Sequence, residues 1–311
     1  MNQLYVINPC AGGKNHVSDI EGRLKALNLN AEVYVTKGNG DATLYVDDYC
    51  RKHDGEPLRI FACGGDGTLN EVVSGAVGHQ GVEVGCYPCG SGNDYVKYWQ
   101  GTDFHDIKAM SEAPSVEVDV MRVRYTSLRN KGQEPKTRYA LNTMNYGFEA
   151  EVCRAMADVR RNAFLGGRLA YTTGIVKCLA TGRHNPCRIS VDGKVWREGD
   201  IMLASLANGR YAGGGFLCAP RSMNDDGLLE VTAITPISVL HFASIIKYYK
   251  NGEYLDRPDI QKITSYCRAQ SVTIENDRDF AIGIDGEVLF GNHFEVENLH
   301  HALRFITAAV R

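Results

Sequence analysis

The sequence lacks the features that mark several classes of protein. None of its apolar runs reaches the length of a membrane-spanning helix. Its first residues have no basic stretch followed by an apolar core, so we expect no secretory signal peptide. A formal net charge of −3 gives no reason to expect a nucleic-acid partner. Internal repeats and low-complexity tracts are also absent. Together these absences predict a cytoplasmic protein made of ordinary globular domains.

The ten cysteines do not follow the spacing of a disulfide framework or a zinc site. Most of them are isolated within apolar runs, where a thiol behaves as a small hydrophobic group. One close pair, Cys86 and Cys89, is compatible with redox or zinc chemistry. No second pair accompanies it, and it leads directly into a glycine-rich loop. We therefore expect reduced thiols, the usual state in the cytoplasm.

The first part of the chain alternates short strands with helices. Hydrophobic residues make up 44% of the chain and charged residues 23%, and 311 residues are enough for two globular domains. Strands are expected at 4–7, 31–36, 58–63 and 82–87, and helices at 17–27, 42–52 and from 68 onward. This alternation predicts a parallel, doubly wound sheet, in which ligands bind at the carboxyl ends of the strands.

The stretch Ile60–Glu71 has the layout of a phosphate site. A buried strand breaks at Gly64-Gly65-Asp66-Gly67, and Thr68, an N-cap residue type, opens a helix. Glycines let the backbone approach an anion, and the free N–H groups of a helix start favour negative charge. Asp66 would repel a phosphate unless a cation lay between them, which suggests a metal-bound nucleotide. The alternative is a glycine turn that serves packing alone.

Two further glycine-rich loops follow strands in this part of the chain. Residues 8–14 (Asn-Pro-Cys-Ala-Gly-Gly-Lys) follow the first strand, and residues 88–95 (Pro-Cys-Gly-Ser-Gly-Asn-Asp-Tyr) follow the fourth. Each could be an ordinary turn, the second one capped by Ser91 or Asp94. Three such loops at one edge of a sheet favour a ligand site over turn chemistry alone.

After Pro114 the chain reads as short strands separated by turns, which predicts a mainly antiparallel second domain. Those strands are expected at 115–125, 137–142, 187–195, 200–207, 228–234, 271–275 and 280–284. Helical segments are expected at about 149–182 and 237–249. The first is amphipathic and basic, which suits either an anionic membrane surface or a core helix with a solvated face.

Two acidic motifs in the second part are candidate functional sites. The turn from Met223 to Leu228 could hold a cation through Asp226 and nearby carbonyl groups, or it could be a plain Asp-Gly turn before a strand. Near the end, Asp285 and Glu287 lie two positions apart. If this stretch is extended, both carboxylates point to one side; the alternative is an Asp-Gly hairpin turn.

Taken in order, the motifs resemble a known family. They are Asn8-Pro9, Gly64-Gly65-Asp66-Gly67-Thr68 with Asn70-Glu71, Gly90-Ser91-Gly92-Asn93-Asp94, Gly213-Gly214-Gly215 with Ala219-Pro220, Asp225-Asp226-Gly227 and Ile284-Asp285-Gly286-Glu287. The chain resembles, over nearly its whole length, the soluble bacterial branch of the diacylglycerol kinase catalytic-domain family, which includes sphingosine and ceramide kinases. The resemblance implies a Rossmann-like first domain at 1–117, related to NAD kinases, and a β-sandwich second domain at 118–311. Whether the last strand, about 300–311, returns to the first domain is left open.

The resemblance also implies a function. It implies ATP and Mg²⁺ in the cleft between the domains and a lipid hydroxyl, such as that of diacylglycerol, as the phosphate acceptor. The implied nucleotide-binding residues are Asn8, Pro9, Cys10, Ala11, Gly12, Thr36, Gly64, Gly65, Asp66, Gly67, Thr68, Leu69, Asn70, Ser91, Asn93 and Asp94. A structural Mg²⁺ would be held by Asp226 and the carbonyl groups of Met223 and Leu228. The segment 160–171 would meet the membrane surface peripherally, and a homodimer is left open.

Three carboxylates are candidates for the general base. Glu287 matches the family's usual proton acceptor and is our first choice, with Asp285 second. Asp66 is a rival, because the sphingosine-kinase branch is thought to use the aspartate of this loop. The chain differs from the family pattern at Ala11–Lys14, where a Ser-Gly-Lys loop is more usual, and at Ser91, where Thr is more usual.

Two other functions remain as alternatives. The first is a kinase of a soluble acceptor, such as an NAD kinase. That family shares the Gly-Gly-Asp-Gly loop, but it does not carry the Asn-Pro loop after the first strand together with the Gly-Ser-Gly-Asn-Asp loop after the fourth. The second is a catalytically silent regulatory protein that responds to nucleotide or lipid. A silent protein would have lost its carboxylates, yet Asp66, Asp94, Asp226, Asp285 and Glu287 are all present. Which lipid is used does not follow from the sequence.

Overall fold

The computed structural model describes residues 1–130, 132–152 and 182–308. Most of the helical segment predicted at 149–182, and all of the basic stretch predicted to meet a membrane at 160–171, lie outside the described residues. Among the described residues, no helix is both long and apolar enough to cross a membrane.

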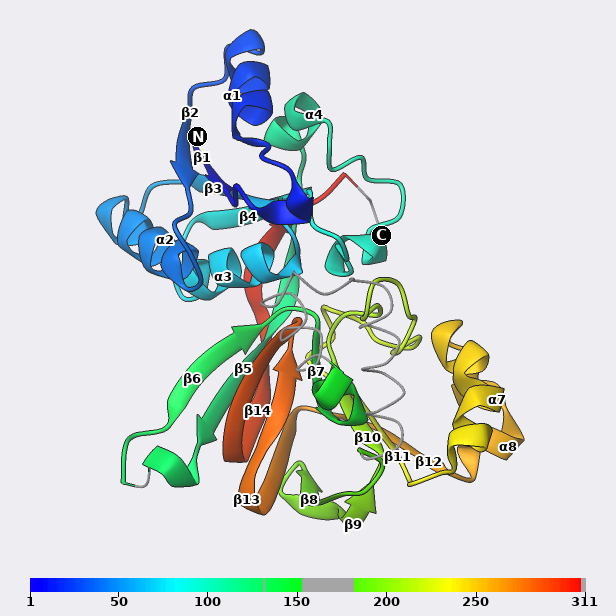
Figure 1. The fold of residues 1–311 in the computed structure, drawn as a ribbon. Coiled ribbons are helices and arrows are strands. Elements are labelled where there is room, and N and C mark those ends of the chain that lie inside the picture. The colour runs from blue at the N-terminus through cyan, green and yellow to red at the C-terminus, as the bar shows by residue number, and fades with distance from the viewer. Residues whose placement is uncertain (131, 153–181, 309–311) are drawn as a thin grey trace.

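The first part of the chain forms the predicted doubly wound layer. Its elements are β1 (Asn2–Ile7), α1 (Val17–Ala26), β2 (Ala31–Val35), α2 (Asp41–Lys52), β3 (Leu58–Gly64), α3 (Asp66–Ala76), β4 (Val82–Pro88) and α4 (Ile107–Glu112). The strands run parallel in the order β4-β3-β1-β2. In Figure 1, α1 and α4 lie above these strands, whereas α2 and α3 lie below them. Because the strands are parallel, their carboxyl ends and the loops that follow lie along one edge.

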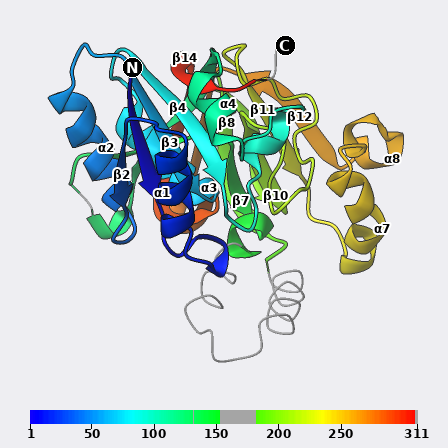
Figure 2. The same cartoon turned by 90° about the horizontal axis from the view of Figure 1, so that it is seen from above.

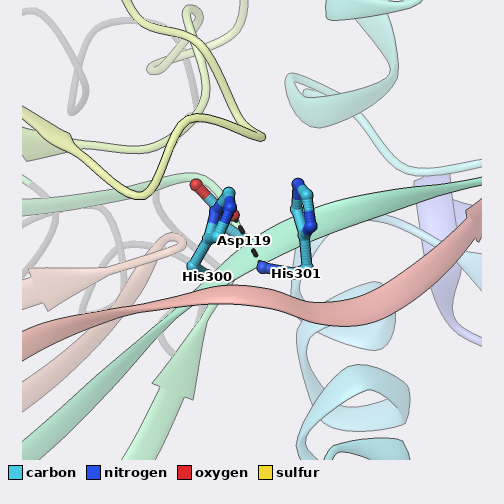
Figure 3. Close-up of side chains that lie close together, drawn as sticks. All are labelled: Asp119, His300 and His301. Atoms are coloured by element: carbon cyan, nitrogen blue, oxygen red, sulfur yellow. Dashed lines mark hydrogen bonds and ion pairs between the residues drawn. The ribbon is translucent and has the colours of Figure 1, made fainter.

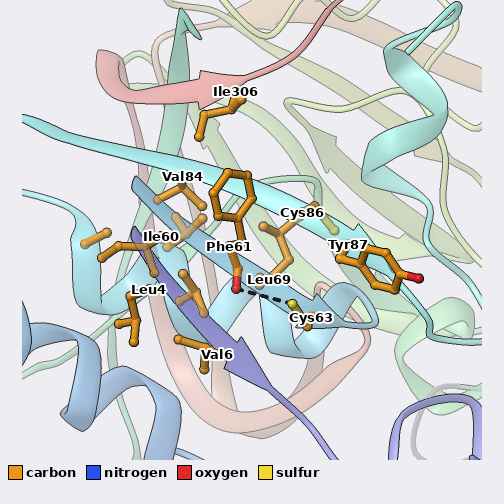
Figure 4. Close-up of a cluster of buried hydrophobic side chains, with 14 of the residues drawn as sticks. Leu4, Val6, Ile60, Phe61, Cys63, Leu69, Val84, Cys86, Tyr87 and Ile306 are labelled. Atoms are coloured by element: carbon orange, nitrogen blue, oxygen red, sulfur yellow. Dashed lines mark hydrogen bonds between the residues drawn. The ribbon is translucent and has the colours of Figure 1, made fainter. Parts of the chain in front are cut away.

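The apolar core of this part lies against the sheet. Leu4, Ile60, Phe61 and Val84 lie on three neighbouring strands, and each is at most 2% exposed. Figure 4 shows them packed together with Ile306, which comes from the far end of the sequence. Near-continuous apolar strands are expected where helices cover both faces of a parallel sheet.

Helix α3 begins two residues earlier than predicted. Gly65 is its N-cap residue and Asp66 its first helical residue, so Thr68 is not the cap. The Thr68 hydroxyl instead accepts a hydrogen bond of 3.1 Å from the Asn8 side chain. A Cβ on Gly64 would lie 2.3 Å from that hydroxyl oxygen, so this position requires glycine. The prediction was wrong because Thr68 binds the neighbouring loop rather than its own helix.

The second part is built mainly from antiparallel strands. They are β5 (Ser115–Thr126), β6 (Lys136–Ala140), β7 (Thr143–Gly147), β8 (Asn185–Val191), β9 (Lys194–Ile201), β10 (Leu203–Ala207), β11 (Leu229–Ile234), β12 (Thr264–Ala269), β13 (Ser271–Ile284) and β14 (Glu287–Ile306). They enclose one apolar cluster that draws residues from nearly all of them, including Met121, Tyr146, Ile189 and Phe294. Helices α7 (Val239–Lys250) and α8 (Pro258–Gln261) lie to one side, as both views show (Figures 1 and 2).

Strand β13 differs from the prediction, which had two strands at 271–275 and 280–284. It is one strand with an irregularity between Glu275 and Phe280. Its first half pairs with β8 and its second half with β7. The polar residues in the middle lie where the strand changes partners, and a β-bulge allows the bend that such a change requires.

Strand β14 belongs to both parts of the molecule. Up to Leu299 it pairs with β13 and β5, and an irregularity follows between Leu299 and Leu303. Beyond it, Arg304 and Phe305 pair in parallel with Glu83 and Val84 of β4. The two parts therefore share one continuous sheet, and Leu303, Phe305 and Ile306 near the end of β14 lie in the core of the first part.

Candidate functional site

The three glycine-rich loops meet at the carboxyl ends of β1, β3 and β4. The Asn8 side chain donates a hydrogen bond to Thr68, which joins the first loop to the second. Gly65 and Gly90 lie so close that a Cβ on Gly90 would be 2.3 Å from the Cα of Gly65. Gly12, at φ +61°, lies against the carbonyl of Cys89. The absence of side chains at these glycines therefore allows three backbone segments to come together.

Asp66 lies in the first turn of α3, where backbone N–H groups are free. Its Oδ1 accepts hydrogen bonds from the backbone N–H groups of Asp94, at 2.6 Å, and Tyr95, at 3.2 Å. Within the described residues, no hydrogen bond reaches its other oxygen, Oδ2. Burial and the nearby charge of Asp94 raise the pKa of Asp66 to about 6. One oxygen of this carboxylate is thus fixed and the other is available to a ligand.

Asp94 connects the glycine-rich loops to the second part of the chain. The side chain is buried, its Oδ1 lies 2.5 Å from the Lys97 ammonium group, and its Oδ2 accepts a hydrogen bond of 2.7 Å from the Gly214 N–H. Gly214 belongs to the triple-glycine loop. Sequence reasoning missed Lys97, although its position three residues after Asp94 in a helical turn places the two side chains on one face. Lys97 brings a positive charge to the edge where the loops meet.

The other predicted nucleotide residues surround this edge. Thr36 is half-buried at the end of β2 and its N–H donates to the carbonyl of Ile7. Ser91 is exposed at the tip of the third loop. Asn93 adopts a positive φ of 50° and its side chain exchanges two hydrogen bonds with the Gly90 backbone. Glu71, which sequence reasoning left without a role, accepts hydrogen bonds from the N–H groups at the start of α2, 2.9 Å and 3.1 Å long.

Asp285 is a buried anchor. Its two carboxylate oxygens accept hydrogen bonds from the backbone N–H groups of Leu141, Asn142 and Thr143, at 2.8–3.1 Å, and from the Asn70 side chain at 2.9 Å. Burial raises its pKa, while these donors act in the opposite direction. Four donors fill the hydrogen-bonding capacity of this carboxylate. Because one of them, Asn70, belongs to α3, Asp285 ties α3 to the hairpin between β13 and β14.

The stretch that carries Asp285 and Glu287 is a turn and not an extended strand. Asp285 has a φ of 44° and Gly286 a φ of 87°, and together they connect β13 to β14. The condition for both carboxylates to point to one side is therefore not met. The alternative of an Asp-Gly hairpin turn describes the backbone, because both residues tolerate the left-handed conformation that a tight turn requires.

Glu287 differs from Asp285 in its surroundings. It is half-buried, and none of the described residues donates a hydrogen bond to its carboxylate. Burial, together with the charges of Glu71 and Asp285, raises its pKa, and Arg138 opposes this effect. A carboxylate with a raised pKa and free oxygens is suited to accept a proton near neutral pH.

The loop predicted to hold a structural cation has a different arrangement. Asp226 Oδ1 accepts a hydrogen bond of 3.0 Å from the Leu228 N–H, and its Oδ2 forms an ion pair with Arg268 of β12. Met223, at the start of this loop, is 43% exposed. The guanidinium group thus contacts the oxygen that a cation would need. Nothing in the spacing of the loop pointed to Arg268, which is far away in the sequence.

A second group of metal-ligand types lies beside this loop (Figure 3). The ligand atoms of Asp119, His300 and His301 lie within 4.8 Å of one another. The fully buried Asp119 carboxylate already accepts four hydrogen bonds, from the Gly227 N–H, the Asn298 side chain, the His300 ring and the His301 N–H. Both oxygens of Asp119 are therefore occupied by hydrogen bonds. These bonds connect β14, at its bend near His300 and His301, to the loop that contains Asp226.

Cys86 and Cys89 are free thiols in the described structure. Burial raises the pKa of both, well above the ordinary value for Cys86 and to about 11 for Cys89. Because the thiolate is the reactive form, raised pKa values disfavour redox chemistry at this pair.

Comparisons with known proteins agree with this architecture. The family model "Diacylglycerol kinase catalytic domain" matches residues 2–123, and "YegS C-terminal NAD kinase beta sandwich-like domain" matches residues 142–307, more than half of the chain. A protein of Stenotrophomonas maltophilia named "Probable lipid kinase YegS-like" is 26% identical over 302 residues, which cover 94% of this chain and 91% of the relative. One of the same name from Yersinia pestis is 26% identical and covers 97% and 95%.

Two solved structures have a similar fold. A crystal structure described as a diacylglycerol kinase from Bacillus anthracis has a TM-score of 0.67 at 21% identity, and the match covers 99% of this chain and 98% of that one. Yeast NADH kinase complexed with NADH has a TM-score of 0.55 at 13% identity, with 100% and 84% covered. At these identities the likeness concerns the fold alone, and it agrees with the predicted pairing of a Rossmann-like part with a β-sandwich.

Proposed function

This chain belongs to the diacylglycerol kinase catalytic-domain family and carries the YegS type of C-terminal domain, and from that premise we propose that it is an ATP- and Mg²⁺-dependent lipid kinase. Its reaction would transfer the γ-phosphate of ATP to the hydroxyl group of diacylglycerol or a related lipid. The first domain, 1–117, would bind the nucleotide and the second, 118–311, would supply the acceptor site. The observation that carries the proposal is the free, half-buried carboxylate of Glu287 on a hairpin fixed to the helix of the phosphate loop.

The nucleotide would bind where the three loops meet. The backbone N–H groups at the start of α3, residues 64–68, would surround the phosphates, and the helix start favours their negative charge. Lys97 would neutralise part of the charge on the transferred phosphoryl group. Phosphoryl transfer depends mainly on such positioning and neutralisation, because little charge can be left uncompensated in the transition state.

The residues at this edge fit a cation bound to the nucleotide. Asp66 presents one unoccupied oxygen toward the ligand side, and oxygen ligands are those that Mg²⁺ prefers. Mg²⁺ would supply charge neutralisation between the phosphate oxygens. Asp94 would act through its contacts with Lys97 and Gly214, the second of which holds the third loop against the second part.

Glu287 would be the general base. One of its oxygens would accept the proton of the lipid hydroxyl as that hydroxyl oxygen bonds to the γ-phosphorus and the bond to the β–γ bridging oxygen breaks, releasing ADP. Asp285 is not free for this step, because four donors already occupy its oxygens. Asp66 is less suited, because one oxygen is bound to backbone N–H groups and the other would hold the cation of the nucleotide.

The proposal is tested by transfer of label from [γ-³²P]ATP, with Mg²⁺, into a panel of lipid alcohols in mixed micelles. The panel contains diacylglycerol, monoacylglycerol, a sphingoid base and a polyprenol, and NAD is the soluble control. We expect one labelled lipid, whose identity also names the acceptor.

Label on NAD alone would contradict the proposal and would make the chain a kinase of a soluble acceptor. No label on any acceptor, with ATP binding intact, would contradict it in favour of a regulatory protein. Vesicle co-sedimentation would test the peripheral membrane contact that a lipid acceptor requires.

A further inference from the structure

Asn70 is a buried amide that joins three elements of the structure. It lies in α3, one helical turn after Asp66, so the two side chains share a face of that helix. Its Nδ2 donates hydrogen bonds to the Tyr139 carbonyl of β6, at 2.8 Å, and to Oδ2 of Asp285, at 2.9 Å. Both partner atoms are acceptors, which fixes the orientation of the amide. Asn70 thus connects the helix of the phosphate loop to the second part of the chain.

The amide nitrogen of Asn70 is fully used within the protein. An asparagine amide carries two N–H groups, and here each of them donates to a protein acceptor. The side chain is 8% exposed. The family resemblance implies that Asn70 belongs to the nucleotide site, yet both N–H groups point to the second part. These contacts indicate that the side chain holds other groups in position.

The acceptor Asp285 and the proposed base Glu287 lie at the two ends of one tight turn. Asp285 has a φ of 44° and Gly286 a φ of 87°, and β14 begins at Glu287. Of the four donors described for Asp285, three are the backbone N–H groups of residues 141–143, which belong to the second part. The fourth is Asn70, from the first part. The place where Glu287 leaves the turn is therefore tied to α3 through this one side chain.

The charges on α3 and on the hairpin act on one another. Burial is the main cause of the raised pKa of Asp66, and the charge of Asp285 adds to it. Burial is likewise the main cause of the raised pKa of Glu287, and the charge of Glu71 adds to it. Because the interaction of two charges weakens with distance, the start of α3 and the hairpin turn are close neighbours.

We propose that Asn70 is a positioning residue, which holds Glu287 in place against the bound nucleotide by tying the hairpin turn to α3. This inference rests on the proposed kinase reaction. Phosphates bound at residues 64–68 would fix the first turn of α3, and the two hydrogen bonds of Asn70 would extend that order to the hairpin. A displacement of about 1 Å from the reactive geometry can cost about 10²-fold in rate. Asn70 should therefore affect turnover and not ATP affinity.

The kinetic test compares Asn70→Ala with a matched variant, using the lipid acceptor that the labelling panel identifies. Asn70→Ala should lose about 10–100-fold in kcat, while its KM for ATP changes less than about twofold. The control is Asn185→Ala in β8, whose half-buried amide donates to the backbone carbonyls of Gly182, Ile201 and Met202. It should keep the kcat of the natural chain. An unchanged kcat in Asn70→Ala, an equal fall in both variants, or a loss confined to the KM for ATP overturns the proposal.

A second measurement needs no turnover. Hydrogen–deuterium exchange is followed in the full chain with Mg²⁺ and AMPPNP, a non-hydrolysable ATP analogue. In the natural chain the analogue should slow exchange in peptides that cover residues 64–68 and 284–288. In Asn70→Ala it should slow exchange only at residues 64–68. If Asn70→Ala does not fold, Asn70→Ser takes its place, and its shorter side chain should leave the hairpin less protected than in the natural chain.

The exchange data also separate this inference from the proposed function. Protection of residues 284–288 that is equal in the natural chain and the variant overturns the positioning role, as does a natural chain in which only residues 64–68 are protected. No protection at residues 64–68 in the natural chain contradicts the proposed nucleotide site itself, and with it the inference that depends on that site.

Discussion

Two carboxylates two positions apart have different roles because they have different neighbours. Asp285 accepts four hydrogen bonds, three of them from successive backbone N–H groups, and is fixed in place. Glu287 receives none from the described residues and keeps both oxygens for a ligand. A carboxylate that must accept a proton cannot also be saturated with donors. At the scale of single residues, the number of hydrogen-bond donors therefore separates the buried anchor, Asp285, from the proposed base, Glu287.

The first prediction concerns the stability that Asp285 provides. Asp285→Asn replaces one acceptor oxygen by an NH₂ group that would face N–H donors. We expect the free energy of unfolding to fall by about 2–4 kcal/mol, measured by urea denaturation. Glu287→Gln is the matched control and should change it by less than about 0.5 kcal/mol, because Glu287 makes no such bonds. Equal losses in the two variants would show that the hydrogen bonds to Asp285 do not carry this stability.

The second prediction concerns pH. The pKa of Asp66 is raised to about 6, so in the folded protein this carboxyl is neutral below that pH and charged above it. Because the charged form would hold the cation of the nucleotide, the affinity for Mg²⁺–ATP should rise as the pH passes through about 6 and level off about one pH unit higher. Equilibrium titrations with a fluorescent ATP analogue between pH 5 and 8 would measure it.

Asp66→Asn is the control for that titration, and it should bind Mg²⁺–ATP weakly and without this pH dependence. An affinity that is flat across pH 6 in the natural chain would contradict the assignment of Asp66.

At this scale the sequence singled out candidate residues but did not reveal their surroundings. The motifs predicted Asp66, Asp285 and Glu287 as a set, and their environments distinguish them. Those environments come from residues far away in the chain, such as Asn70 and Leu141 for Asp285. Arg268 was missed for the same reason, since its partner Asp226 is far away in the sequence. Lys97 was missed although its partner, Asp94, lies only three residues earlier.

At the scale of elements, the site depends on loops that are in contact through glycine. The loop after β3 and the loop after β4 touch at Gly65 and Gly90, where no side chain fits. The carboxylates of Asp66 and Asp94 are then held within one short stretch of structure, linked through the Asp94 N–H. The parallel order of the strands brings the loops to one edge, and the glycines decide how closely they approach.

The third prediction tests this contact. In Gly90→Ala the new Cβ would lie 2.3 Å from the Cα of Gly65, so the two loops must separate. We expect ATP affinity to fall at least about tenfold, measured by isothermal titration calorimetry. Gly22→Ala in α1 is the control, because nothing lies within 4 Å of its Cβ; there we expect unchanged ATP affinity and a gain in stability of about 0.5–1 kcal/mol. Unchanged affinity in Gly90→Ala would mean that the two loops do not have to touch.

Most elements of the first part follow from the sequence because each strand is a short apolar run bounded by glycine or proline. The start of α3 did not follow, because Thr68 binds Asn8 of another loop. The sequence also did not predict that β13 is a single strand, since its polar residues at 276–279 are typical of a turn. Both errors arise where a residue's partner belongs to another element.

At the scale of the molecule, β14 joins the two parts. Its last residues lie in the core of the first part, where the ring of Phe305 is fully buried and stacks on Trp99. Its first residues pair with β13 and β5 of the second part. Glu287 begins this strand, so the proposed base and the core of the first part are connected through a single element. The proposed site would therefore depend on the whole chain and not on either part alone.

The fourth prediction follows from this shared strand. The two tryptophans report separately, Trp99 on the first core and Trp196 on the second. In Trp196→Phe and in Trp99→Phe, each with one remaining tryptophan, the urea midpoint from tryptophan fluorescence should coincide with the midpoint from circular dichroism of the same variant. Phe305→Ala should lower both midpoints together, with a loss of about 3–5 kcal/mol. A loss confined to the Trp99 signal would contradict the coupling of the two parts.

The measurement that tests the account most directly is the turnover of Glu287→Gln with the lipid acceptor that the labelling panel identifies, with ATP binding measured in parallel. The account predicts that kcat falls by about 10²–10⁴-fold, because the acceptor hydroxyl loses its base, while ATP affinity and the free energy of unfolding stay near those of the natural chain. A variant that retains full turnover would contradict the assignment of Glu287 as the base.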